Sequence, residues 1–171
     1  VFLVHTGELP TSEQRQMMDA MYVSLIEHGI SPTTIIARTL ASCGTPSQAS
    51  LAGAMLSIAD WHGGSGEQLG ELLAELVDTS SNDDELRVHS AELVAAHQAQ
   101  RRRFEGFGHP QHPDADPRAM KLFSVAEATG VAGRHVTAAR LLEEEIERSL
   151  GRRLALNVTG AIAAIFLDLG F

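Results

Sequence analysis

Residues 106–118 read Gly-Phe-Gly-His-Pro-Gln-His-Pro-Asp-Ala-Asp-Pro-Arg, and they interrupt a chain that is otherwise rich in helical patterns. Gly106 and Gly108 permit positive φ and let a ligand approach the backbone closely. The three prolines fix φ and prevent a helix from forming through the loop. The loop therefore holds the His109 imidazole and the Arg118 guanidinium in a fixed relation, which suits a site for a carbonyl compound that bears carboxylates.

Two other histidines stand at similar breaks in the helical pattern. His28 precedes one glycine, and His62 precedes a pair of glycines. Glycine ends helices readily, so a histidine beside it is held by the helix end and still faces a cleft. Because histidine titrates near neutral pH, it can donate or accept a proton there. We interpret His28, His62 and His109 as parts of one active site.

The composition favours an all-α domain. Of the 171 residues, 44% are apolar and only 5% are aromatic, while Ala, Leu and Gly are abundant. The chain is long enough for one domain with a substantial core, and this composition suits close-packed helices better than a β-sandwich. The formal net charge of −9 argues against a general nucleic-acid binder, because such a protein needs a basic face.

The sequence shows neither a membrane-spanning segment nor a signal peptide. No apolar run approaches the roughly 18 residues needed to span a bilayer, and no signal-peptide pattern opens the chain. The one cysteine, Cys43, cannot form an intrachain disulfide, which favours a reducing compartment. We therefore expect a cytoplasmic protein without a membrane partner.

Turn residues divide the chain into predicted helices. Pro32 suits a first helical turn, and Gly44 stops the helix that begins there. The helix from Pro46 to about Asp60 is rich in small residues and is predicted to be central, because another helix can approach it closely. Trp61 is expected in the core. The predicted helices span residues 11–28, 31–44, 46–60, 66–78, 83–104, 116–129, 134–150 and 157–169.

Four segments, taken in order, resemble the citrate synthase superfamily, which includes the citryl-CoA lyases. They read Glu-His-Gly-x-Ser-Pro-Thr-Thr-Ile-Ile-Ala-Arg from Glu27, Trp-His-Gly-Gly from Trp61, Gly-Phe-Gly-His with Asp-Pro-Arg-Ala from Gly106, and Leu-Asn-Val-Thr-Gly from Leu156. Each segment alone is a weak signal. The ordered set, with the interval between the histidine and the arginine of the third segment intact, is specific.

The resemblance implies an all-α, citrate synthase-like helical fold, shortened relative to full-length synthases. Residues 1–171 then form a single citrate synthase-like catalytic region. In that interpretation, about 1–60 and 150–171 resemble the core of the family's large domain, and about 65–150 contain the helices of its small domain. The resemblance also implies a homodimer or a higher homo-oligomer.

The same resemblance assigns roles in a Claisen-type reaction at the methyl carbon of an acetyl thioester. In the family, the residue matching His62 hydrogen-bonds the thioester carbonyl as the enolate forms. The residue matching His109 polarises the ketone of oxaloacetate, or handles the hydroxyl proton of a citryl group in the reverse direction. The residue matching His28 contacts the keto acid, and the one matching Arg118 pairs with a carboxylate. Placed donors at such an oxygen are usually the largest catalytic contribution.

Coenzyme A enters as the thioester substrate, and neither a tightly bound cofactor nor a metal is expected. In the family, the loop matching Gly106, Phe107 and Gly108 helps to hold coenzyme A through backbone groups. Two interpretations stay open for Arg101–Arg103, which precede this loop: a solvated helix end that suits the helix dipole, or a contact with coenzyme A phosphates. No His-x-x-x-His pattern or cysteine cluster supports a metal site.

Thr159 departs from the family pattern. The family has an aspartate at this position, and it is the base that takes the methyl proton. Threonine cannot do so at neutral pH, so another group serves, the catalysed step differs, or activity is lost. Asp60, Glu67 and Asp168 lie near the matched segments. Cleavage of citryl-CoA starts at the hydroxyl, where His109 can act, and water can supply the later proton.

This departure favours a citryl-CoA lyase, which cleaves citryl-CoA to acetyl-CoA and oxaloacetate. The alternative is a citrate synthase or 2-methylcitrate synthase, which condenses an acyl-CoA with oxaloacetate. A non-catalytic relative that binds coenzyme A is the third reading, because Thr159 stands where the family has its base. The small molecules expected at the site are thus an acyl-CoA and an oxaloacetate-like or citrate-like acid.

Overall fold

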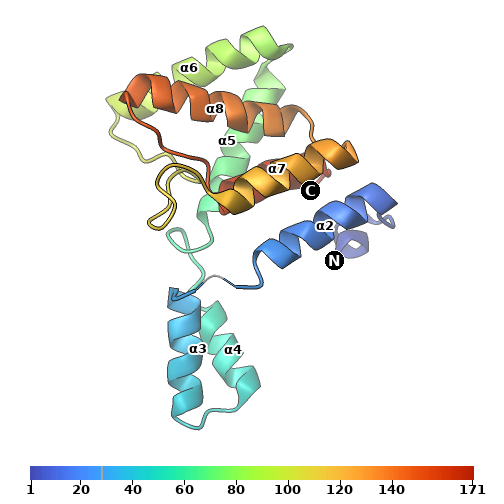
Figure 1. Ribbon diagram of the computed structural model, residues 1–171, viewed down its shortest axis with the longest axis vertical. Coiled ribbons are helices and arrows are strands. Elements are labelled where there is room, and N and C mark those ends of the chain that lie inside the picture. Colours follow the sequence, from blue (N-terminus) through green and yellow to red (C-terminus); the bar gives the residue numbers. More distant parts are fainter. Residues whose placement is uncertain (28) are drawn as a thin grey trace.

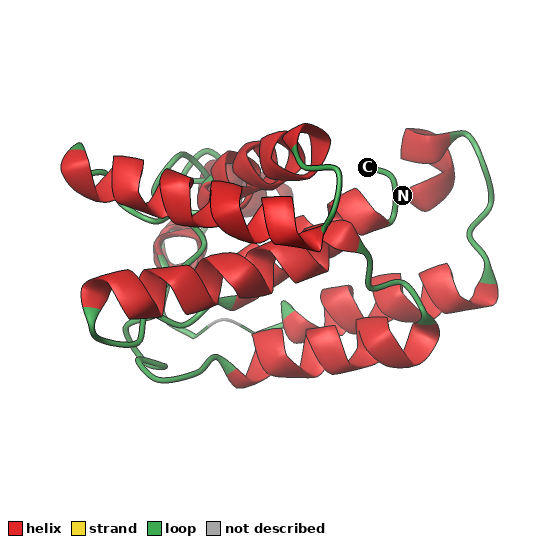
Figure 2. Ribbon diagram, turned by 90° about the horizontal axis from the view of Figure 1, so that it is seen from above, coloured by secondary structure: helices red, strands yellow, loops and turns green. Residues whose placement is uncertain are grey.

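The computed structural model describes residues 1–27 and 29–171, and the regular secondary structure in these ranges is helical (Figure 2). Extended backbone within them pairs only as isolated bridges, one of which joins Phe107 and Leu156. The predicted all-α class is therefore confirmed. The helices are α1 (Phe2–Thr6), α2 (Ser12–Ser24), α3 (Pro32–Ser42), α4 (Ser47–Met55), α5 (Ser65–Thr79), α6 (Asp83–Ala99), α7 (Pro117–Thr129), α8 (Arg134–Leu150) and α9 (Val158–Asp168).

Helix α9 is the centre of the main body. It packs against α5, α7 and α8, while α6 lies on α8 and α2 lies on α7 (Figure 1). A helix that is apolar on nearly all sides is expected to be largely buried, and residues 160–165 of α9 are buried. Ala161, Ala164 and Ile165 are fully buried along it. The site described below is built around the first turn of this helix.

Local signals account for most helix boundaries. Thr11 and Gln14 form the reciprocal bonds of a capping box at the start of α2, and Pro117 occupies the first turn of α7. Helix α6 is shorter than predicted, because it ends at Ala99 rather than near residue 104. Arg101 adopts a left-handed conformation with φ of 54°, and this turn ends the helix without a glycine to mark it in the sequence.

The prediction that the small-residue helix is central is wrong. Helices α3 and α4 pack on each other as a hairpin that projects from the main body (Figure 1). Gly53 does permit the close approach, since a Cβ there would lie 2.5 Å from Leu40 Cδ1. The outer side of α4 faces solvent, with Leu51 63% exposed. The prediction for Trp61 is also wrong, because its side chain is 90% exposed rather than buried in the core.

Asp168 joins the end of α9 to the start of α8. Its carboxylate accepts hydrogen bonds from the backbone N–H groups of Gly133, His135 and Val136, at distances of 2.7, 3.0 and 3.0 Å. The ring Nδ1 of His135 lies 2.8 Å from the same carboxylate. Helix α8 has no capping side chain of its own, so Asp168 satisfies backbone donors that every helix N-terminus leaves open. Asp168 is therefore a structural residue.

Asp116 joins α7 to the start of α9. The carboxylate is 1% exposed; it accepts hydrogen bonds from the backbone N–H groups of Arg118 and Val158, at 3.0 and 2.9 Å. It also accepts from the Arg118 side chain through Nε and one terminal nitrogen, at 3.0 and 2.8 Å. Burial raises the pKa of Asp116, but these hydrogen bonds and the charge on Arg118 outweigh it, and the net pKa is lowered. The folded state therefore holds this carboxylate ionised.

Replacing the carboxylate, Asp116→Asn, should lower the free energy of unfolding at pH 7 by about 2 kcal/mol, because charge-assisted bonds are lost beside a half-buried guanidinium. Folding lowers the pKa of this carboxyl group from its unfolded value of 3.8. The ionised group therefore stabilises the fold at pH values above 3.8, and this contribution is lost as the pH falls below 3.8. The difference in the free energy of unfolding between wild type and variant should therefore become smaller in acid. Urea unfolding at pH 7 and at lower pH measures both effects.

Asp114→Asn is the matched control, since Asp114 is exposed on the same loop. Equal stabilities of Asp116→Asn and the control at pH 7 would contradict this account of the tie.

Candidate active site

A pocket of about 710 Å³ lies where four separate segments meet. These are residues 30–32, 61–65, 102–111 and 150–157, and we call this pocket the cleft. The predicted site residues that line it are His62, His109, Gly106, Phe107 and Gly108. The structure thus brings together two histidines that are distant in sequence with the loop expected to hold coenzyme A.

The floor of the cleft exists because two glycines cross. Gly106 has φ of 80°, and a Cβ on it would lie 2.4 Å from Leu69 Cδ2 and 3.2 Å from Gly160 Cα. A Cβ on Gly160 would lie 2.6 Å from the carbonyl oxygen of Gly106. Any side chain at either position would separate the loop from the start of α9. The left-handed φ and the close approach both require glycine at position 106.

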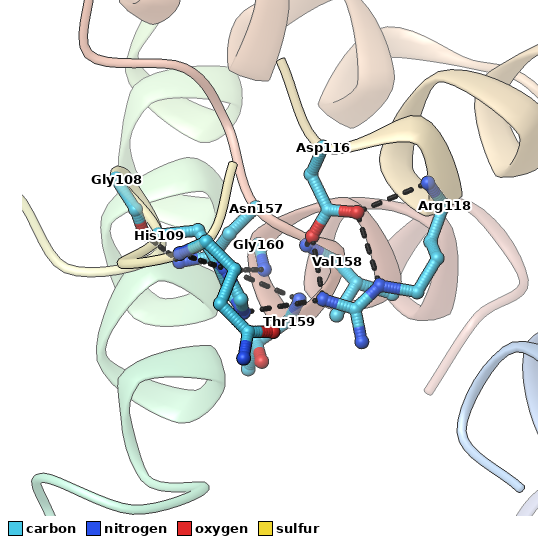
Figure 3. A network of polar contacts seen from close by, with 9 residues as sticks. Gly108, His109, Asp116, Arg118, Asn157, Val158, Thr159 and Gly160 are labelled. Atoms are coloured by element: carbon cyan, nitrogen blue, oxygen red, sulfur yellow. Dashed lines mark hydrogen bonds and ion pairs between the residues drawn. The ribbon is translucent and has the colours of Figure 1, made fainter. Parts of the chain in front are cut away.

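Asn157 fastens this crossing by hydrogen bonds. Its backbone N–H donates to the carbonyl of Gly106 at 3.0 Å. Its side-chain amide donates to the carbonyl of Gly108, also at 3.0 Å (Figure 3). Its side-chain oxygen accepts from the N–H groups of Thr159 and Gly160, at 3.0 and 3.1 Å, and so caps α9. One side chain therefore fixes both the glycine loop and the first turn of the central helix.

His109 is placed by donors at both ring nitrogens. The backbone N–H of Gln111 lies 3.2 Å from Nδ1, and a terminal nitrogen of Arg118 lies 3.4 Å from Nε2. The ring of His112 stacks at a centroid distance of 4.9 Å. A neutral imidazole has only one acceptor nitrogen, so the ring can accept from one of the two donors at a time. Its other nitrogen then presents an N–H group, and His109 can either donate or accept a proton.

Arg118 stands beside His109, as the loop pattern predicted. Its guanidinium is oriented by Asp116, which contacts it on two nitrogens as described above (Figure 3). The side chain is 21% exposed, so it retains access to solvent. A guanidinium that is fixed in this way can present a planar donor group to a carboxylate.

His62 is held by a tight turn and by the start of α3. The N–H of His62 donates to the carbonyl of Ala59 at 2.8 Å, and the N–H of Ala59 donates back to the His62 carbonyl at 3.0 Å. Nε2 of His62 lies 3.3 Å from Oγ1 of Thr33. The ring is only partly buried, so a substrate in the cleft can reach it.

Thr159 lines a second pocket, of about 900 Å³, which shares His62 with the cleft. We call this second pocket the apolar groove, because most of its wall is hydrocarbon, with Leu25, Ile58 and Phe166 among its larger side chains. Thr159 follows the cap residue of α9 and lies close to α5, since a Cβ on Gly66 would be 3.0 Å from its Cγ2. The last predicted site residue, His28, lies outside the described residues.

Three arginines line the cleft. Arg102 and Arg103 line it together with Arg152, and all three are exposed. Phe104, which also lines the cleft, stacks on the buried ring of His97 at 5.5 Å between centroids. In a chain with a net charge of −9, this local concentration of arginines suits an anionic group.

Sequence reasoning missed three residues that build the site. Asp116 had a readable signal, since an aspartate before a proline is typical of a helix start. Asn157 was noticed only as part of a matched segment, although an asparagine before an apolar helix is also a cap signal. Arg152 carried no signal, because only the fold brings it to the cleft that Arg102 also lines.

Three other carboxylates were considered as a base. Asp168 caps α8, Asp60 is exposed, and Glu67 is exposed where it lines the same pocket as His62 and Thr159. Among the described residues, no set of three histidine, cysteine, aspartate or glutamate side chains could hold a metal ion. Within the same ranges, the helices are too short or too polar to cross a membrane.

Comparison with known proteins gives a consistent result. A family model described as "Citrate synthase, C-terminal domain" matches residues 1–171. The structure of citryl-CoA lyase from Hydrogenobacter thermophilus is 35% identical with a TM-score of 0.89, covering 99% of this chain and 64% of that one. Citrate synthase from Thermotoga maritima is 26% identical with a TM-score of 0.79, covering 99% and 45%.

Sequence relatives agree with the structures. "Putative citrate synthase 2" of Mycobacterium bovis is 31% identical over 163 residues, covering 93% of this chain and 41% of the relative. "Citrate/2-methylcitrate synthase" of Bacillus subtilis is 31% identical over 119 residues, covering 68% and 30%. The chain thus spans less than half of the length of these relatives. Because the family model matches the whole chain, and a relative above 30% identity covers most of it, the chain belongs to the citrate synthase family.

Proposed function

We propose that this chain carries out the carbon–carbon bond chemistry of a citryl-CoA lyase, which converts citryl-CoA to acetyl-CoA and oxaloacetate. The observation that supports this most is the convergence of His62, His109 and the glycine loop on one cleft, with Arg118 beside His109. This set supplies donors for a thioester oxygen, a group for the hydroxyl proton and a cation for a carboxylate. Thr159 supplies no base.

Cleavage needs only the groups that are present. The hydroxyl of the citryl group gives its proton to the acceptor nitrogen of His109. The adjacent carbon–carbon bond breaks, the hydroxyl carbon becomes the ketone of oxaloacetate, and the electron pair moves into the thioester enolate. An N–H group of His62 stabilises the enolate oxygen, and Arg118 binds a carboxylate of the departing keto acid. The enolate carbon then takes a proton from water, and His109 returns its proton to solvent.

Coenzyme A would lie along the cleft toward the arginines. We propose that Arg102 and Arg152 contact its phosphates, since both are exposed cations at the same pocket. The backbone of Gly106, Phe107 and Gly108 would contact the pantetheine arm, because glycine lets a ligand approach the main chain. The thioester carbon would then stand near His62.

Three further assignments, which concern the subunits, the domain division and the cellular compartment, are proposals of the same kind. We propose a homodimer formed through the α3–α4 hairpin, where Leu51 and Leu56 are 63% and 87% exposed. Apolar side chains of this size on a projecting hairpin are typical of an interface between subunits. We also propose that about 1–60 and 150–171 act as the large-domain core and about 65–150 as the small domain, in a cytoplasmic enzyme.

The dimer is tested by Leu56→Glu, which places a charge in the proposed interface. The wild-type chain should have twice the monomer mass in sedimentation, and the variant should have the monomer mass at the same concentration. Val4→Glu is the control, because Val4 is 84% exposed on α1, away from the hairpin. A wild-type chain that sediments as a monomer would refute the proposal.

The activity is tested by cleavage of citryl-CoA, coupled to reduction of the oxaloacetate that is released. We expect turnover by the wild-type chain and a loss of at least about 100-fold in His109→Ala, which is the usual scale for a general acid–base group. His112→Ala is the matched control, because it removes an imidazole that stacks on His109 from the same loop but leaves the proposed acid–base group in place. Activity retained in His109→Ala would show that the role proposed for this residue is wrong.

The condensation alternative is a citrate synthase or 2-methylcitrate synthase. We expect Thr159→Asp to raise the rate at which acetyl-CoA and oxaloacetate release free thiol by about 100-fold, because it restores a carboxylate base. Thr159→Asn has the same shape without the base and should not raise it. If wild type and both variants bind coenzyme A but neither cleave nor condense, the non-catalytic interpretation is favoured instead.

A further inference from the structure

The apolar groove meets the cleft at His62, and this junction has a consequence for the substrate. His62 lines both pockets, whereas the arginines line only the cleft. In the proposal above, the thioester lies at His62 and the α-carbon is bonded to the citryl carbon at His109. A hydrocarbon chain on the same α-carbon can then pass His62 into the groove.

The groove is much larger than an acetyl group needs. Its volume is about 900 Å³, whereas an acetyl thioester ends in a single methyl group. Ile162, Ala163 and Phe166 of α9 line it together with Gly66 and Gly70 of α5. A Cβ on Gly70 would meet no atom within 4 Å, so the groove has open space at this position.

The carboxylates that line the groove are exposed to solvent. Thr159 lines it with a hydroxyl and a methyl group, where the family pattern would place a carboxylate. The two carboxylates that line it, Glu67 and Glu71, are exposed on α5. An ionised carboxylate at position 159 would penalise a hydrocarbon chain packed against it, and threonine removes that penalty.

We propose that the groove holds the hydrocarbon tail of the substrate. The protein would then accept straight-chain acyl-CoA thioesters longer than propionyl-CoA. The proposal rests on the coenzyme A site proposed above. The bond changes are those already given: cleavage of the corresponding alkyl-substituted citryl-CoA gives oxaloacetate and the longer acyl-CoA, and the α-carbon that carries the chain takes the proton. Gly70 is then the residue that determines the length accepted.

Binding of coenzyme A, acetyl-CoA and hexanoyl-CoA, measured by titration calorimetry, tests this without requiring turnover. Hexanoyl-CoA should bind at least about tenfold more tightly than acetyl-CoA, because each fully buried CH₂ contributes about fourfold. Gly70→Leu should remove most of this difference by filling the groove, and Gly70→Ala should reduce it partially. Asp78→Leu is the control, because it adds the same side chain at an exposed position of α5 that lines neither pocket.

The outcomes separate the two proposals. If acetyl-CoA and hexanoyl-CoA bind equally, the coenzyme A site stands and the groove proposal fails. A preference for hexanoyl-CoA that persists in Gly70→Leu also overturns it, since the longer chain would then lie elsewhere. If coenzyme A and both thioesters fail to bind, the proposed function fails, and the groove proposal fails with it.

Discussion

The close crossing of Gly106 and Gly160 is the constraint on which the site depends. The backbone of one lies where a side chain on the other would be, so the glycine loop can rest directly on the first turn of α9. Asn157 then bonds to both segments. Everything that follows in the loop, including the position of His109, starts from this contact. The proline-rich path after it carries the chain to Arg118 at the start of α7.

Electrostatics at the site separates two kinds of cation. Arg118 is oriented by the buried carboxylate of Asp116 and is therefore a fixed donor beside His109. Arg102 and Arg152 are exposed at the cleft and can adapt to a flexible anion. A fixed guanidinium such as that of Arg118 suits a small anion that must be held in one orientation. Exposed arginines suit the phosphates of a long, flexible ligand. Because the chain has a net charge of −9, its overall composition does not indicate an anionic ligand, whereas the arginines at the cleft do.

The sequence predicted the helices well where local residues end them and less well where distant contacts decide. The bounds of α5, α7, α8 and α9 agree closely with prediction, because caps, prolines and glycines mark them. The ends of α2, α4 and α6 were each predicted four or five residues too late, and at α6 the reason is that Arg101 turns without a glycine. The exposure of α4 and Trp61 was also missed, because small or aromatic residues indicate contact without indicating the partner. Arg152 reaches the cleft only through tertiary folding, so no local pattern could reveal it.

Helix α9 is tied by a carboxylate at each end. Asp116 bonds to the N–H of its first residue, and its own last residue, Asp168, bonds to the start of α8. Partial unfolding that frees this helix would break both ties and expose a largely apolar surface, so the first turn of α9 opens only when the body unfolds. Any local rearrangement of the cleft therefore falls to its other segments, residues 30–32 and 61–65, which join the projecting hairpin to the body.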